Sequence, residues 1–257
     1  MIALIASLLL SVATSQERTL PVLPTPESST VVLKIVIPQE GQRVSSPTWV
    51  QFRIDGFALG SASQFERAGE VAVSKMGQTV HVVVDNQPYF PINGPAVDPF
   101  DESGNFYDMS YKFKIPYKLD DGAHTIRMFP ARSYGESLKG DKTFAAVQFY
   151  VGNKTEDAID LSSPYITYNE PSSLMPLKVD KPVLLDFYLS NAELSADGYK
   201  VRLSIDGKIN RLLTLWVPYY IYGLSSGHHT IRLELLDAQN KLVPGAFNDV
   251  EQSIVIH

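Results

Sequence analysis

The sequence predicts an all-β protein made of two tandem antiparallel β-sandwiches. From Val31 onward, short runs in which apolar and polar residues alternate recur between clusters of Gly, Pro, Asn and Asp. This pattern is typical of antiparallel strands joined by turns. No segment shows a convincing apolar repeat of helical period. Three segments of the first half have counterparts in the second half, in the same order, so the sequence predicts that one domain occurs twice.

The first thirty residues precede this strand pattern. The apolar run 2–12 is followed by small residues at 13–15, which predicts a signal peptide over residues 1–15, cleaved before Gln16, and therefore export. No Lys or Arg precedes the run, so a buried strand is the alternative. Residues 16–30 contain three prolines among Ser, Thr and Glu, which predicts a disordered tether. No later stretch is long and apolar enough to predict a transmembrane segment.

The evidence for duplication is the three matched pairs of segments. In the first two pairs the apolar residues alternate as in a half-buried strand, and the second pair ends in Asp-Asn or Asp-Gly, a turn signal. The pairs are 47–54 with 182–189, 77–86 with 198–207, and 119–127 with 224–232, at offsets of 135, 121 and 105 positions.

The falling offsets show where the two copies differ. They place 14 extra residues of the first copy between Ile54 and Gly77, and 16 more between Asn86 and Leu119. We therefore predict an elaborated first domain over 31–152 and a plainer second domain over 164–257, with function where the repeat breaks. The polar stretch 153–163, which precedes a proline and contains the glycosylation sequon Asn153-Lys154-Thr155, is predicted to be a linker.

The motif Gly-x-His-Thr-Ile-Arg occurs at 122–127 and again at 227–232. It resembles the late strands of bacterial immunoglobulin-like and fibronectin-III-like modules of exported proteins. The first copy, with its segments 84–90 and 127–139, is similar to uncharacterised exported proteins of chlamydia-like bacteria. These resemblances imply two immunoglobulin-like sandwiches and export, and they imply no activity.

Composition excludes several kinds of function. The 28 acidic and 22 basic residues give a net charge of −6, and no basic run suggests a nucleic-acid surface. There is no cysteine, so disulfides, thiolate metal sites and a thiol nucleophile are impossible. No nucleophile elbow, phosphate loop or paired-carboxylate motif is recognisable. We therefore expect a protein that is not an enzyme and has no cofactor.

Polar and aromatic residues of the first copy form the predicted binding cluster. Planar donors, carboxylates and phenol rings of this kind bind a carboxylate or a sugar, and the alternative is a loop held by its own Arg–Glu pairing. The residues are Arg127, Arg132, Tyr134, Glu136 and Lys139 after the third matched segment, and Asp85, Asn86 and Tyr89 after the second.

Histidines and an acidic loop give two further candidates. His124 and His229 occupy equivalent repeat positions, which favours a structural role, and His81 lies out of phase with the neighbouring valines, which predicts a solvated strand face. No histidine has the spacing of a metal site. The loop 98–105 contains three carboxylates that suit calcium, although acidic turns are common in exposed loops.

Together these observations predict an exported, non-catalytic binding, adhesion or structural interaction protein whose partner is a protein or a glycan. The alternative is a carbohydrate-binding module, for which the aromatic stretch 216–222 offers rings that stack on sugars, although sandwiches bury most of their aromatic residues. A hydrolase with a non-standard site is the third possibility.

Overall fold

The structure is a computed structural model that describes residues 16–94, 110–155 and 159–257. The predicted signal peptide and the loop 98–105, which was a candidate for calcium, lie outside the described residues. In the described part of the chain, no helix is long and apolar enough to cross a membrane.

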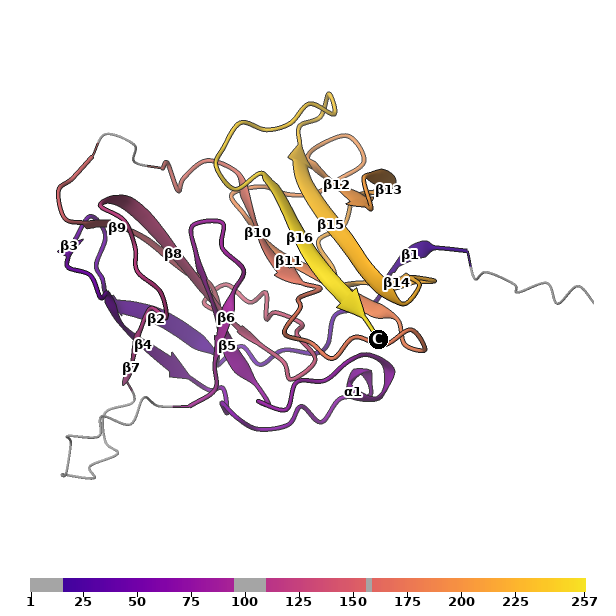
Figure 1. Cartoon of the computed structure of the whole chain (residues 1–257), viewed down its shortest axis with the longest axis horizontal. Helices are drawn as coiled ribbons and strands as arrows, with labels where there is room; N and C mark the ends of the chain where they lie inside the picture. Colours follow the sequence, from indigo (N-terminus) through magenta and orange to yellow (C-terminus); the bar gives the residue numbers. More distant parts are fainter. Residues whose placement is uncertain (1–15, 95–109, 156–158) are drawn as a thin grey trace, which may run out of the picture.

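Two β-sandwiches follow one another along the chain (Figure 1). The strands of the first are β2 (Val32–Ile37), β3 (Arg43–Val44), β4 (Trp49–Asp55), β5 (Thr79–Val84), β6 (Phe90–Ile92), β7 (Ser110–Lys114), β8 (Gly122–Ala131) and β9 (Ala145–Val151). They form one sheet in the order β2-β4-β7 and a second in the order β3-β9-β8-β5-β6. All neighbours pair antiparallel except β3 and β9.

The second sandwich repeats this arrangement. Its strands are β10 (Tyr165–Glu170), β11 (Val183–Ser190), β12 (Lys200–Ile205), β13 (Lys208–Leu213), β14 (Tyr219–Tyr222), β15 (Gly227–Leu236) and β16 (Asp249–Ile256). The pairing β10-β11-β14 corresponds to β2-β4-β7, and β13-β12-β15-β16 corresponds to β6-β5-β8-β9. The three matched segments thus fall on equivalent strands, and the predicted fold of two tandem sandwiches is confirmed.

Alternation of apolar residues explains why the two sheets of each sandwich pack face to face. In β4, Val50, Phe52 and Ile54 are buried and pack across the sheet interface against β5, where Val80 and Val82 are buried. Burying side chains of this size stabilises a fold by about 1.5–3 kcal/mol each. The second sandwich has its own core of the same kind.

The N-terminal segment corrects one prediction. Residues 16–30 are not a disordered tether, because β1 (Arg18–Pro21) pairs with β14 and adds a fourth strand to the sheet β14-β11-β10. The edge of β14 offers backbone groups that need partners, and a proline is tolerated at such an edge. Further along, Thr25 is buried against the first sandwich. The segment therefore contacts both sandwiches.

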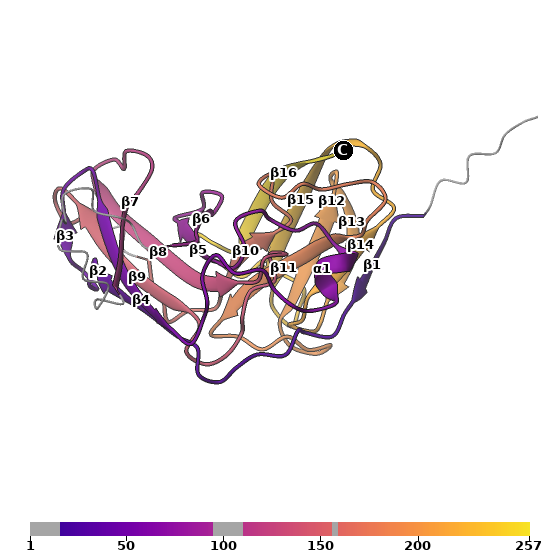
Figure 2. The same cartoon turned by 90° about the horizontal axis from the view of Figure 1, so that it is seen from below.

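The first insertion also contacts the second sandwich. It contains the short helix α1 (Arg67–Glu70), which lies beside strands of the second sandwich (Figure 2). Val71, which follows the helix, packs with Leu184 and Tyr220. The first insertion thus helps to hold the two sandwiches together.

Candidate functional site

A repeated Asp–His contact shows what the shared motif does. Nδ1 of His124 lies 2.8 Å from Oδ2 of Asp85, and Nδ1 of His229 lies 2.7 Å from Oδ2 of Asp206. The other oxygen of Asp85 accepts the backbone N–H of Thr125, and Asp206 does the same in the second copy. Both histidines therefore hold a turn against a strand, in agreement with the predicted structural role. Asp85, one of the predicted binding residues, is used within the fold.

A buried chain of hydrogen bonds joins the two sandwiches. Nδ1 of His81 lies 2.6 Å from Oδ1 of Asn169, and Nδ2 of Asn169 donates to Oδ2 of Asp186 at 2.7 Å. Nζ of Lys139 lies 2.5 Å from the other oxygen of Asp186, whose side chain is fully buried. The charges of Lys139 and Asp186 are thereby paired, as burial requires.

The prediction that His81 lies on a solvated face is wrong. Its side chain points away from the core of the first sandwich, but that face is covered by the second sandwich, and only 3 % of the residue is exposed. Its ring stacks on Tyr89 with centroids 3.7 Å apart. Burial lowers the pKa of His81 to about 4, so the imidazole is neutral at neutral pH.

Glu170 is buried next to this chain. The hydroxyl of Tyr89 donates to Oε1 of Glu170 at 2.6 Å, and burial raises the pKa of Glu170 to about 8. Gly135 lies against the carboxyl group, since a Cβ there would be 2.6 Å from Cγ of Glu170. Tyr89, another predicted binding residue, is therefore part of the junction between the sandwiches.

Three more predicted binding residues have intramolecular partners. Tyr134 is fully buried and its hydroxyl lies 2.8 Å from Oγ1 of Thr25. Glu136 pairs with Arg67 of the first insertion, so the expected pairing within the loop is replaced by one across the chain. Arg132 donates to a side-chain oxygen of Gln78 and to the backbone oxygen of Pro26. These three side chains therefore hold the segments of the junction together, as the alternative of a self-paired loop expects in part, and ligand binding by the cluster stays a prediction.

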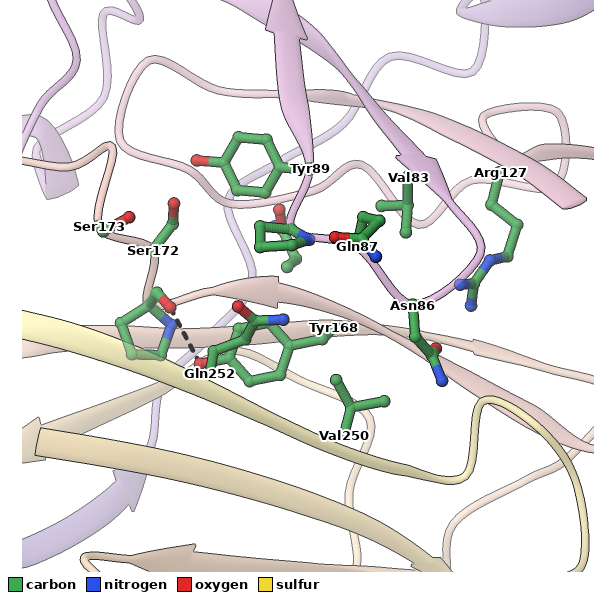
Figure 3. Close-up of a pocket in the computed structure, with 13 residues that line it drawn as sticks. Val83, Asn86, Gln87, Tyr89, Arg127, Tyr168, Ser172, Ser173, Val250 and Gln252 are labelled. Carbon is green, nitrogen blue, oxygen red and sulfur yellow. Dashed lines mark hydrogen bonds between the residues drawn. The ribbon is translucent and has the colours of Figure 1, made fainter. Parts of the chain in front are cut away.

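The structure brings Asn86, Tyr89 and Arg127 together around one small pocket (Figure 3). Arg127 is 1 % exposed, donates to Oγ1 of Thr167 at 2.9 Å, and lies 3.7 Å from the ring centre of Phe247. Burial lowers its pKa to about 10. The space is about 20 Å³, which suits one water molecule, so this pocket has no room for an organic ligand.

An open groove with aromatic walls lies elsewhere at the junction. One part of about 440 Å³ is lined by residues of both sandwiches, and a second part of about 840 Å³ lies on the second sandwich alone. Asn191 and Trp216 line both parts, so the two form one continuous surface, which we call the Trp216 groove. Its other aromatic residues are Phe144, Tyr165, Tyr188 and Tyr199, and its polar residues include Lys139, Asp141 and Glu193.

Packing fixes the aromatic rings of this groove. Phe144 stacks on Tyr188 with centroids 4.4 Å apart, and Tyr188 meets Trp216 edge to face at 5.1 Å. The indole N–H of Trp216 donates to the backbone oxygen of Phe187 at 3.0 Å, which fixes the orientation of the ring. The sequence named Trp216 only within an aromatic stretch, and it gave no signal that Asn191 and Asp141 would join it.

The described residues contain no group of three or more His, Asp or Glu side chains that could hold a metal ion.

No family model matches the sequence, and no curated protein matches it. The chain is similar to several solved structures. One contains fibronectin(III)-like modules of CbhA from Clostridium thermocellum, with 12% identity over 88% of this chain and 94% of that chain, at a TM-score of 0.30. Another is dimeric latent PorU from Porphyromonas gingivalis, with 12% identity over 90% of this chain but 21% of that one, at a TM-score of 0.29.

A third similar structure is SGBP-B from Bacteroides ovatus in complex with a mixed-linkage heptasaccharide. It has 12% identity over 88% of this chain and 70% of that chain, at a TM-score of 0.17. TM-scores this low carry no argument about function, and the fold stands on the strand order itself. The comparisons give no support to the resemblance to exported proteins of chlamydia-like bacteria.

Proposed function

We propose that the chain is an exported, non-catalytic binding protein and that the Trp216 groove binds a glycan. Export rests on the predicted signal peptide. The observation that carries the binding proposal is the continuity of an open groove with a fixed indole ring at its centre.

The chemistry of the groove suits a sugar chain. The apolar faces of sugar rings pack on aromatic side chains, and hydroxyl groups need fixed donors and acceptors beside them. Trp216 supplies the ring, Asp141 supplies a carboxylate, and Asn191 supplies an amide oxygen whose position is fixed because its NH2 group donates to the backbone oxygens of Leu161 and Ser163. The rings are held in place before a ligand arrives, which lowers the entropy cost of binding.

Two observations support a role without catalysis. His81 is oriented by Asn169, as a catalytic base would be, but no hydroxyl group among the described residues donates to its Nε2. The buried carboxyl groups of Glu136, Glu170 and Asp186 at the junction are held by intramolecular partners. Their hydrogen bonds and ion pairs are made within the chain, across the contact between the sandwiches.

A glycan array followed by titration with the best ligand tests this proposal. We expect Asp141→Ala, an exposed residue with no hydrogen bond among the described residues, to weaken binding about tenfold without changing stability. Trp216→Leu should abolish binding. Trp49→Leu is the matched control, because Trp49 is also an exposed tryptophan but does not line the groove. Unchanged binding by both groove variants would contradict the proposal.

A protein partner is the second candidate, favoured by exposed apolar residues on β13. This strand lies at the end of its sheet, and two of its apolar residues are exposed, Ile209 at 68 % and Leu212 at 42 %. Exposed apolar residues on an edge strand are typical of contact with another chain. A pull-down with the chain starting at Gln16 should then recover a partner that Ile209→Asp fails to recover.

A further inference from the structure

A second pocket at the junction shares no residue with the Trp216 groove. Its volume is about 300 Å³, at the lower end of the range for small-molecule sites. Both sandwiches contribute to its apolar lining, which consists of Met76, Pro91, Leu174, Met175 and Pro176. His81 and Tyr89 also line it. We call this space the His81 pocket.

The hydrogen bonds of Asn169 fix which nitrogen of His81 carries the proton. Nδ2 of Asn169 lies 2.6 Å from the backbone oxygen of Gly135 and 2.7 Å from Oδ2 of Asp186, and both of these are acceptors. The nitrogen of the amide is therefore the donor, and its oxygen faces His81. Since that oxygen accepts, Nδ1 of His81 must carry the hydrogen.

It follows that Nε2 of His81 has a lone pair. Burial lowers the pKa of His81 to about 4, so the ring stays neutral at neutral pH. Nε2 has no hydrogen-bond partner among the described residues, and it is not among the side-chain atoms that are both unpartnered and fully enclosed. The pocket that His81 lines therefore offers the lone pair of an uncharged ring in mostly apolar surroundings, whereas the unpartnered Oγ1 of Thr79, which also lines the pocket, is enclosed.

We propose that the His81 pocket binds a small, mostly apolar molecule with one hydroxyl group, of the phenol class, whose hydroxyl donates to Nε2 of His81. An aromatic body suits the two thioether groups of Met76 and Met175, since sulfur makes favourable contacts with aromatic rings. A carboxylate would place its own lone pairs against Nε2. Two cationic residues also line the pocket, Arg132 and Lys75. The Nη atoms of Arg132 donate to Gln78 and Pro26 and its Nε is enclosed, and Lys75 is an exposed residue whose ammonium group is solvated by water.

Three small probes test this assignment on the native chain by calorimetry and by amide chemical shifts. p-Cresol should bind at least tenfold more tightly than 4-methylanisole, which has the same body without the donor, because a lost hydrogen bond to a buried partner costs that much. 4-Methylbenzoate should bind more weakly than p-cresol. Equal affinity of p-cresol and 4-methylanisole, stronger binding of 4-methylbenzoate, or no saturable binding of p-cresol at millimolar concentration would each overturn the proposal.

Variants separate the hydrogen bond from the apolar contacts. His81→Phe keeps a ring of similar shape, so it should erase the preference for p-cresol and leave 4-methylanisole binding unchanged; a persisting preference would overturn the proposal. Leu174→Ala leaves the hydrogen bonds of His81 unchanged. This variant should fold normally, because Leu174 lines the pocket but is 54 % exposed. It should weaken both probes by a similar factor. Leu242→Ala, at a 45 % exposed residue outside the pocket, is the matched control and should change neither.

Discussion

Replacement of Glu170 by Gln tests whether the junction holds a protonated carboxyl group. Glu170 is buried, accepts a hydrogen bond from Tyr89, and has a pKa raised to about 8 by burial. In the unfolded chain the same group ionises near pH 4.5. Between these two pH values the folded protein holds a proton that the unfolded chain has lost, so stability falls as the pH rises from about 4.5 to about 8.

The size of this effect follows from the shift. Each pKa unit is worth about 1.4 kcal/mol, so the whole window costs roughly 5 kcal/mol and the part below pH 7 costs on the order of 3 kcal/mol. Gln has the shape of a protonated Glu, keeps an oxygen for the hydroxyl of Tyr89, and has no proton to lose. We therefore expect Glu170→Gln to raise the free energy of unfolding by on the order of 3 kcal/mol at pH 7 and by little at pH 4.5.

Urea unfolding of both proteins from pH 4.5 to pH 9 measures the difference directly. The difference isolates Glu170, because His81 titrates in both proteins and its contribution cancels. Glu66→Gln is the matched control. Glu66 is exposed and its side chain makes no capping hydrogen bond to helix α1, so this change should alter the free energy of unfolding by less than about 0.5 kcal/mol. Parallel pH profiles of the native protein and Glu170→Gln would refute a buried neutral carboxyl group at this position.

Two further substitutions test contacts that hold the fold. His124→Ala should lower the free energy of unfolding by about 1–3 kcal/mol. Because the hydrogen bond to Asp85 raises the pKa of His124, this loss should be largest below about pH 6.5 and shrink as the pH rises, which thermal unfolding at pH 5.5 and pH 8 would show. Gly135→Ala should cost more than about 2 kcal/mol, since φ is +89° and the new Cβ would meet Glu170. Gly207→Ala, with φ of +73° and open space, should cost less in the same urea titration.

The sequence predicted the strands and their duplication, because alternation of apolar residues and turn signals are local properties. It failed at the junction, where a second sandwich covers a face that alternation assigns to solvent. One signal was present: in β11 and β5 the positions that point away from their own core include Leu184 and Val83, which are apolar. Apolar residues on both faces of a strand predict burial on both faces, and this would have placed His81 in an interface. The partners of Tyr134 and Glu136 come from distant segments and had no sequence signal.

The way in which the two copies diverged explains why the ligand sites lie at the junction. Strands β4 and β11 are equivalent in the repeat, at an offset of 135 positions. Three side chains that point away from the core of their own sandwich are exposed or half-buried in β4, and their counterparts in β11 are buried. They are Trp49, Gln51 and Arg53 in β4, and Leu184, Asp186 and Tyr188 in β11. In the second copy the same backbone face thus became a docking surface for the first sandwich, with Asp186 paired to Lys139. Both the His81 pocket and the part of the Trp216 groove shared by the sandwiches are lined from the two sides of this contact, so neither exists on one sandwich alone.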